Sequence, residues 1–150
     1  MLYDDLARVL DEARVTIHRA VVAIDAIHDG ATVSVPMRAV LEFLRREDGH
    51  TVSAIARARS VSRQHIQALV NELLEQGLVE RIDNPQHRSA PIVRLTERGV
   101  EQIDEMHARE RAVLEPGLLE RPALTDERLV AAAEVLVEIG DLMASRREPS

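Results

Sequence analysis

The sequence predicts a mainly α-helical protein with one small β-hairpin, and three observations support that fold class. Apolar residues recur every three to four positions near both ends of the chain, as in amphipathic helices. Two short segments rich in β-branched residues, 78–82 and 92–95, flank a polar loop, as in a hairpin. With 150 residues, 45% of them apolar, residues 1–150 are expected to form one domain with a buried core.

The first two helices are predicted from apolar spacing and from helix-breaking residues. Residues 2–28 place Leu6, Leu10 and Ile17 in one apolar stripe at helical spacing. The segment that follows, DGATVSVP, contains glycine, serine and proline and is expected to end this helix. Pro36 is expected in the first turn of the second helix, where its missing N–H is not needed. Gly49 is expected to stop that helix.

The strongest signal is the segment 53–73, SAIARARSVSRQHIQALVNEL. It predicts a short helix over 51–59, a turn at Ser60–Val61 and a helix over 62–76 with Ser62 as its N-cap. Ser60 stands where such a turn usually has glycine, which is tolerated if this position does not need a positive φ. The five positions that a helix-turn-helix buries hold apolar or small residues: Ile55, Ala56, Val61, Ile66 and Leu69.

A helix-turn-helix followed by a two-stranded hairpin is a winged helix, and this chain has that order. The wing is predicted over 82–92, with the polar loop DNPQHRSAP exposed between its strands. A fifth helix is expected to begin at Thr96 and to end or kink at Pro116–Gly117, and a sixth begins near Thr125. Gly99 is expected to pack closely against a neighbouring helix. The sequence thus predicts a winged-helix lobe over 34–99, flanked by helices over 1–28 and 100–146.

Charge and composition restrict the possible functions. The net charge is −7, but residues 51–99 carry net +2 while the two flanking segments carry −3 and −6. A DNA-binding module between acidic helices has this distribution, because only the face near phosphate needs positive potential. The absence of cysteine excludes disulfides, zinc-thiolate sites and thiol redox sensing. The charged N-terminal segment does not resemble a signal peptide, and no apolar stretch is long enough to span a bilayer, so a cytoplasmic protein without membrane contact is expected.

The polar residues on the outer side of the fourth predicted helix are the candidate DNA-binding residues. Amide, hydroxyl, imidazole and guanidinium groups are the ones that hydrogen-bond base edges and phosphates. Acidic residues appear only in the far half of this helix. Arg88 is expected near the tip of the wing, within reach of the minor groove or its phosphates. The remaining candidates are Ser62, Arg63, Gln64, His65, Gln67 and Asn71.

The chain resembles the MarR family of bacterial transcriptional regulators. Three segments carry the resemblance: IARARSVSRQHIQALVNELLEQGLVER, NPQHR and LTERG. The resemblance implies a homodimer with interlocked terminal helices, a palindromic double-stranded DNA operator, and repression that small aromatic or phenolic ligands, or oxidants, relieve. The family often has an Asp-x-Arg pair in the wing. In this chain those two positions hold His87 and Ser89. Arg88, between them, is therefore the best remaining candidate for a DNA contact by the wing. Without cysteine, any effector is noncovalent or a metal.

Two pairs of potential metal ligands also stand out. Asp25 and His28 on the first helix, and Asp104 and His107 on the fifth, have the i, i+3 spacing of helical ligand pairs, and Glu101 or His50 could complete a set. Solvated polar faces explain such common residues more simply, so neither a metal nor a cofactor is predicted.

Two further function classes are weighed against DNA binding. The sequence shows no nucleophile elbow, phosphate loop or carboxylate pair, so an enzyme is not expected. A winged helix that has lost DNA binding and acts as a protein-interaction scaffold is the alternative, and the net charge of −7 is compatible with it. The polar, acid-free face formed by Arg63, Gln64 and Gln67 favours DNA, because a scaffold does not need it.

Overall fold

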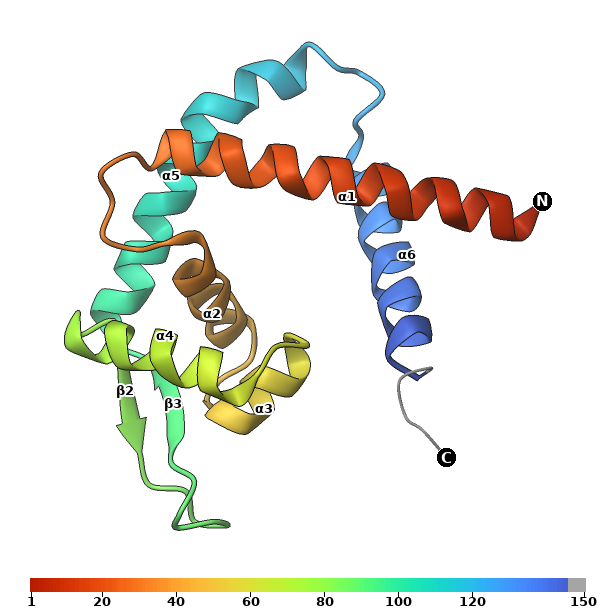
Figure 1. Ribbon diagram of the computed structural model, residues 1–150. Helices are drawn as coiled ribbons and strands as arrows, with labels where there is room; N and C mark the ends of the chain where they lie inside the picture. The colour runs from red at the N-terminus through yellow and green to blue at the C-terminus, as the bar shows by residue number, and fades with distance from the viewer. Residues whose placement is uncertain (146–150) are drawn as a thin grey trace. The chain divides into compact units, whose positions relative to one another are not determined.

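The computed structural model describes residues 1–145 and confirms the predicted fold class (Figure 1). Two compact units make up the chain: Met1–Glu110, which contains the whole winged helix, and the segment from Arg111 onward. Residue 146, the last of the predicted C-terminal helical segment, lies outside the described residues. The elements are α1 (Leu2–Ile27), α2 (Val35–Arg46), β1 (His50–Thr51), α3 (Val52–Ala58), α4 (Arg63–Glu75), β2 (Val79–Ile82), β3 (Ile92–Leu95), α5 (Glu97–Leu119) and α6 (Asp126–Ser145).

The N-terminus of α2 forms as the sequence predicts, but the helix ends earlier than expected. Ser34 is its N-cap and accepts a hydrogen bond from the backbone N–H of Met37 at 3.4 Å, with proline in the first turn. The helix ends at Arg46, three residues before the predicted stop. Gly49 instead has φ +70° in the turn before β1, where a Cβ would lie 2.8 Å from Ile92 Cγ2.

The sheet has three strands, whereas the sequence predicts only a two-stranded hairpin. Its order is β1-β3-β2, and β1 pairs antiparallel with β3 through His50–Val93 and Thr51–Ile92. A strand of two residues is too short to show alternation, which explains why the sequence pattern misses it. Thr51 also caps α3, accepting from the backbone N–H of Ala54 at 3.2 Å, so the predicted helix over 51–59 begins one residue later.

One hydrophobic core lies within the winged helix, where α2, α3 and α4 pack together with the sheet and the first turns of α5. In contrast, neither α1 nor α6 contains a buried residue. The fully buried side chains of the core include Leu41, Ile55, Val70, Leu73, Val93 and Ile103.

The turn of the helix-turn-helix differs from the sequence expectation, because Ser60 has φ +54°. The backbone N–H of Ser60 donates to Arg57 O at 3.1 Å, and that of Val61 donates to Ala56 O at 3.1 Å. These two bonds form a Schellman motif, whose C′ residue is left-handed and usually glycine. The turn therefore does need a positive φ, and serine adopts it at an energetic cost.

A Ser60→Gly variant should be more stable than the wild type by about 0.5–1 kcal/mol, since glycine removes the left-handed strain but loses more chain entropy on folding. Urea unfolding at one fixed protein concentration measures this difference. Ser60→Ala is the control, because alanine keeps the strain and should give no gain. A Ser60→Gly variant that is less stable than the wild type would contradict the claim that the positive φ of Ser60 destabilises the folded protein.

Two further expectations about α5 need correction. Of the two alternatives at Pro116–Gly117, an end of the helix is wrong, because Pro116 lies inside α5, which continues to Leu119; a kink there stays a prediction. Gly99 does pack closely, but against backbone that precedes β2 and not against a helix: a Cβ there would lie 2.0 Å from Leu78 O. Across residues 1–145, no helix has both the length and the apolarity that crossing a membrane requires.

Candidate nucleic-acid interface

Helix α4 presents a polar N-terminal end because its inner side is committed to the core. Ile66, Leu69, Val70 and Leu73 are buried against α2, α3 and β2. Ser62 caps the helix and accepts from the backbone N–H of His65 at 3.1 Å. The first turn contains no acidic residue, so the positive end of the helix dipole is not neutralised locally. This end of α4 can therefore accept an anionic group such as a phosphate.

The structure leaves the predicted site residues of α4 exposed or half-buried. Ser62, Arg63, Gln64 and His65 are exposed in its first turn, and Gln67 is half-buried one turn later. In residues 1–145 neither Arg63 nor Gln64 has a side-chain hydrogen bond, so both are available to a ligand. Asn71 is exposed but already engaged, because its Oδ1 accepts from both Gln67 and Arg81.

Arg81 belongs to this surface although the sequence analysis does not identify it. It is the exposed residue of β2, and its Nη2 lies 2.9 Å from Asn71 Oδ1. Arg81 lies on the same face of β2 as Val79, and along that face the burial falls from Val79, which is buried, to Arg81, which is exposed. Its contact with α4 depends on tertiary packing, and no local sequence pattern reveals it.

The wing is shaped by Asn84, a second residue that the sequence analysis misses. Its side chain is 8% exposed, and its Nδ2 donates to Ala90 O at 2.9 Å. Its Oδ1 accepts from the backbone N–H groups of Gln86 and His87 at 3.0 and 3.3 Å. An asparagine that bonds backbone two residues ahead is typical of an Asx-turn, so the segment Asp-Asn-Pro is the available signal.

The second turn of the wing loop presents Arg88. The backbone N–H of Ala90 donates to His87 O at 3.0 Å, which places Arg88 in the middle of a tight turn. The side chain is exposed, and no ion pair holds it within the described part of the chain. Arg88 therefore lies in an exposed turn of the wing loop, and its contact with DNA stays a prediction.

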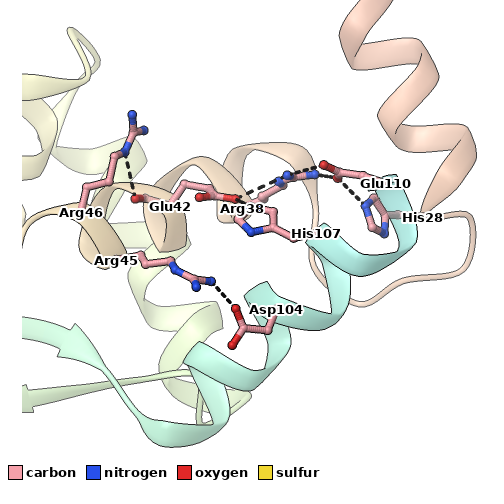
Figure 2. A network of polar contacts seen from close by, with 8 residues as sticks. All are labelled: His28, Arg38, Glu42, Arg45, Arg46, Asp104, His107 and Glu110. Atoms are coloured by element: carbon pink, nitrogen blue, oxygen red, sulfur yellow. Dashed lines mark hydrogen bonds and ion pairs between the residues drawn. The ribbon is translucent and has the colours of Figure 1, made fainter. Parts of the chain in front are cut away.

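The two residue pairs with the spacing of metal ligands bind other partners. His28 Nε2 lies 2.7 Å from Glu110, and His107 Nε2 lies 2.5 Å from Glu42 (Figure 2). Asp104 instead bonds Arg45 at 2.6 Å. Among the residues up to 145, no group of three or more histidines, cysteines or acids is arranged to hold a metal ion.

These contacts form a polar junction between the end of α1, α2 and α5, centred on Arg38. Its guanidinium donates to Glu110 at 2.7 Å and contacts Glu42 at 3.4 Å (Figure 2). Beside it, a cavity of about 260 Å³ is lined by residues that include Ile24, His28, Val33, Arg38 and Met106. The cavity lies where the winged helix adjoins α1.

Burial lowers the pKa of His28 below its ordinary value of about 6.5, and the positive charges of Arg38 and Arg109 lower it further. Its side chain is 7% exposed, and its Nδ1 has no hydrogen-bond partner within residues 1–145. The folded protein therefore favours neutral His28, which donates from Nε2 to Glu110.

Folding stability should consequently decrease on acidification. The depressed pKa contributes stability that is complete above the unfolded value near 6.5 and is lost as pH falls through the lower folded value. His28→Gln should weaken this dependence, because glutamine can donate to Glu110 but does not titrate. Urea unfolding at about pH 7.5 and 5.5 measures the difference, with His87→Gln in the exposed wing as control. An unchanged pH dependence in His28→Gln would exclude this role.

Three comparisons with known proteins agree with this architecture. The sequence model of the MarR family matches residues 37–88. The uncharacterized protein Rv2011c of Mycobacterium tuberculosis is 36% identical over 84 residues, which are 56% of this chain and 50% of that protein. The chain thus spans about half the length of the curated relatives it matches.

Solved structures extend the similarity to the whole chain. The MarR family transcription regulator SP03579 is 26% identical, with a TM-score of 0.71 over 99% of this chain and 96% of that one. A mutant MarR from E. coli complexed with operator DNA has 17% identity and a TM-score of 0.69, covering 93% and 98% of the two chains, and supports the fold alone. The family model matches the winged helix, and the similarity to SP03579 extends over nearly the whole chain, so the chain has the fold of the MarR family of winged-helix transcriptional regulators and resembles that family.

Proposed function

We propose that the protein is a homodimeric transcriptional repressor that binds a palindromic double-stranded DNA operator. The observation that supports this most directly is the capped, acid-free and exposed N-terminal end of α4. Recognition helices of this kind enter the major groove with their N-terminal residues toward the bases. Arg88 would contact the adjacent minor groove or its phosphates. A mutant MarR from E. coli with a similar fold has been solved in complex with operator DNA, which supports the proposal.

The apolar surfaces of the terminal helices support the dimer. On α1, Ile17 and Val22 are 65% and 57% exposed, and on α6, Val130 and Val137 are 58% and 63% exposed. Large apolar side chains exposed in such number on two helices are typical of protein–protein contacts. We propose that a second copy of the chain covers the helices over 1–28 and 100–146, and that two lobes over 34–99 bind half-sites spaced by about 34–36 Å.

The junction cavity supports a noncovalent small-molecule effector. It is lined by both apolar residues and the polar groups of His28 and Arg38, a combination that suits a small aromatic or phenolic ligand. Such a ligand would alter the contacts between α1, α2 and α5 and thereby the spacing of the two lobes. The proposed function is non-enzymatic, and because operator DNA is the proposed ligand, the proposed site of action is the cytoplasm.

Arg88→Ala should weaken binding to all DNA sequences by a similar factor and reduce the slope of log affinity against log salt by about one, because a phosphate contact is lost. Fluorescence anisotropy with the operator and with an unrelated duplex, at several salt concentrations, measures both effects. A change restricted to the operator, with an unchanged salt slope, would exclude the phosphate contact.

Selection from a random duplex library at about physiological salt tests the proposed function as a whole, since nonspecific phosphate binding is weak there. We expect enrichment of a palindrome with half-sites about one helical turn apart. If nothing is enriched and no salt-dependent affinity is found, the proposal is wrong and a protein-interaction scaffold replaces it.

A further inference from the structure

A chain of hydrogen bonds connects the wing to the middle of the recognition helix. Arg81 Nη2, on β2, donates to Asn71 Oδ1 on α4 at 2.9 Å. The same oxygen accepts from Gln67 Nε2, one helical turn earlier, at 2.9 Å. Arg81 and Gln67 do not touch each other in this arrangement, so Asn71 relays the effect of one on the other.

The direction of every bond in this chain follows from the arginine. A guanidinium only donates hydrogen bonds, so the side of Asn71 that faces Arg81 must be its carbonyl oxygen. Gln67 faces that same oxygen and must therefore present its amide nitrogen. Without Arg81, both amides could rotate by half a turn, and Gln67 could present either end toward a ligand.

The consequence is a fixed polarity at Gln67. Its Nε2 is bonded to Asn71, while its Oε1 accepts no hydrogen bond from residues 1–145. In the major groove, adenine and cytosine offer an exocyclic amino group, whereas guanine and thymine offer a carbonyl oxygen. An exposed acceptor is attracted to the first pair and repelled by the second.

We infer that Arg81 is a positioning residue that makes Gln67 select a base with an exocyclic amino group, adenine or cytosine, at one position of each operator half-site. The inference rests on the proposed DNA-binding function. It also gives Asn71 the role of a relay, because both lone-pair positions of its Oδ1 are occupied, while the two N–H groups of its Nδ2 leave the predicted DNA contact possible.

A direct contact between Arg81 and phosphate is the rival role for this exposed cation. The two roles have different signatures. Loss of a phosphate contact lowers affinity for every sequence and reduces the salt slope by about one. Loss of a positioning residue abolishes one base preference. It leaves the salt slope unchanged, because the number of counterions that the DNA releases on binding stays the same.

The experiment is library selection with full-length wild type, Gln67→Ala and Arg81→Met, after circular dichroism has shown that each variant folds. Gln67→Ala identifies the operator position that Gln67 contacts. There, the wild type should prefer amino over keto bases by about tenfold. Arg81→Met should reduce this ratio to about twofold or less at that position only, with an unchanged salt slope.

Two further variants make the test sharper. Arg94→Met is the matched control, because Arg94 is exposed on the neighbouring strand but bonds Glu80 at 2.6 Å. It should keep the base preference. The double variant Arg81→Met with Gln67→Glu should regain that preference, since a carboxylate can only accept hydrogen bonds.

Three outcomes would overturn the inference: an Arg81→Met variant that keeps the amino preference, a uniform affinity loss with a reduced salt slope, or a wild-type preference for guanine or thymine at the Gln67 position. Absence of any enriched operator with the wild type would refute the proposed function instead, and the inference with it. The wild-type selection therefore separates the two failures.

Discussion

Replacing Gly99 by alanine is expected to destabilise the protein by about 3 kcal/mol or more, at the upper limit of ordinary overpacking. The added Cβ would lie 2.0 Å from Leu78 O, 3.0 Å from Leu78 C and 3.3 Å from Leu95 Cδ2. The obstacle is backbone, which cannot rotate away as a side chain can. Leu78 is also fixed on both sides, because its N–H donates to Leu73 O at 2.9 Å and its O accepts from Thr96 N at 3.1 Å.

The measurement is urea or thermal unfolding at fixed protein concentration, since a dimer's apparent stability depends on concentration. Gly117→Ala is the matched control: it lies in the same helix, and its Cβ would meet only Arg121 Nη1 at 3.5 Å. That variant should be neutral or gain up to about 1 kcal/mol from helix propensity. A Gly99→Ala variant as stable as the wild type would show that α5 can move away from β2 without loss.

Replacing Arg63 by alanine is expected to reduce operator affinity by about 5- to 150-fold, equivalent to about 1–3 kcal/mol. Arg63 is the first residue of α4, exposed beside the positive end of the helix dipole, so its guanidinium and the helix end act on the same ligand. If it contacts a base edge, sequence preference at one position of each half-site should relax as well. Gln64→Ala is expected to fall in the same range.

Isothermal titration or anisotropy with the selected operator measures these losses. Arg94→Ala is the control, because it removes the same charge from an exposed site on β3, where Arg94 bonds Glu80 at 2.6 Å. If neither Arg63→Ala nor Gln64→Ala changes affinity or specificity, the proposed placement of α4 in the major groove is wrong.

Most of the fold could be predicted because its signals are local. The N-caps Ser34 and Ser62 and the buried stripe of α4 follow from the spacing of a few neighbouring residues. The two errors in the turns and the sheet have a tertiary origin. Ser60 is left-handed because α3 must end before α4 can cross it, and β1 exists only because β3 offers it partners.

In the candidate site, too, residues with local sequence signals could be predicted, and residues that depend on tertiary contacts could not. The exposed polar residues of α4 could be named from the sequence because helical periodicity alone separates them from the core. Arg81 could not be identified, because its partner Asn71 is ten residues away on another element. Asn84 had a recognisable turn signal, but the sequence did not show that its side chain is buried and bonds three backbone groups.

The bonds of Asn84 also bear on the thermodynamics of binding. A wing loop of nine residues, 83–91, is held in one conformation before any ligand arrives. Fixing a disordered backbone at the moment of association costs about 1–2 kcal/mol per residue in conformational entropy, which would weaken the complex substantially. Here that entropy is already lost when the chain folds. The wing therefore approaches its partner as a rigid body, and its association should show little of the unfavourable entropy that accompanies coupled folding and binding.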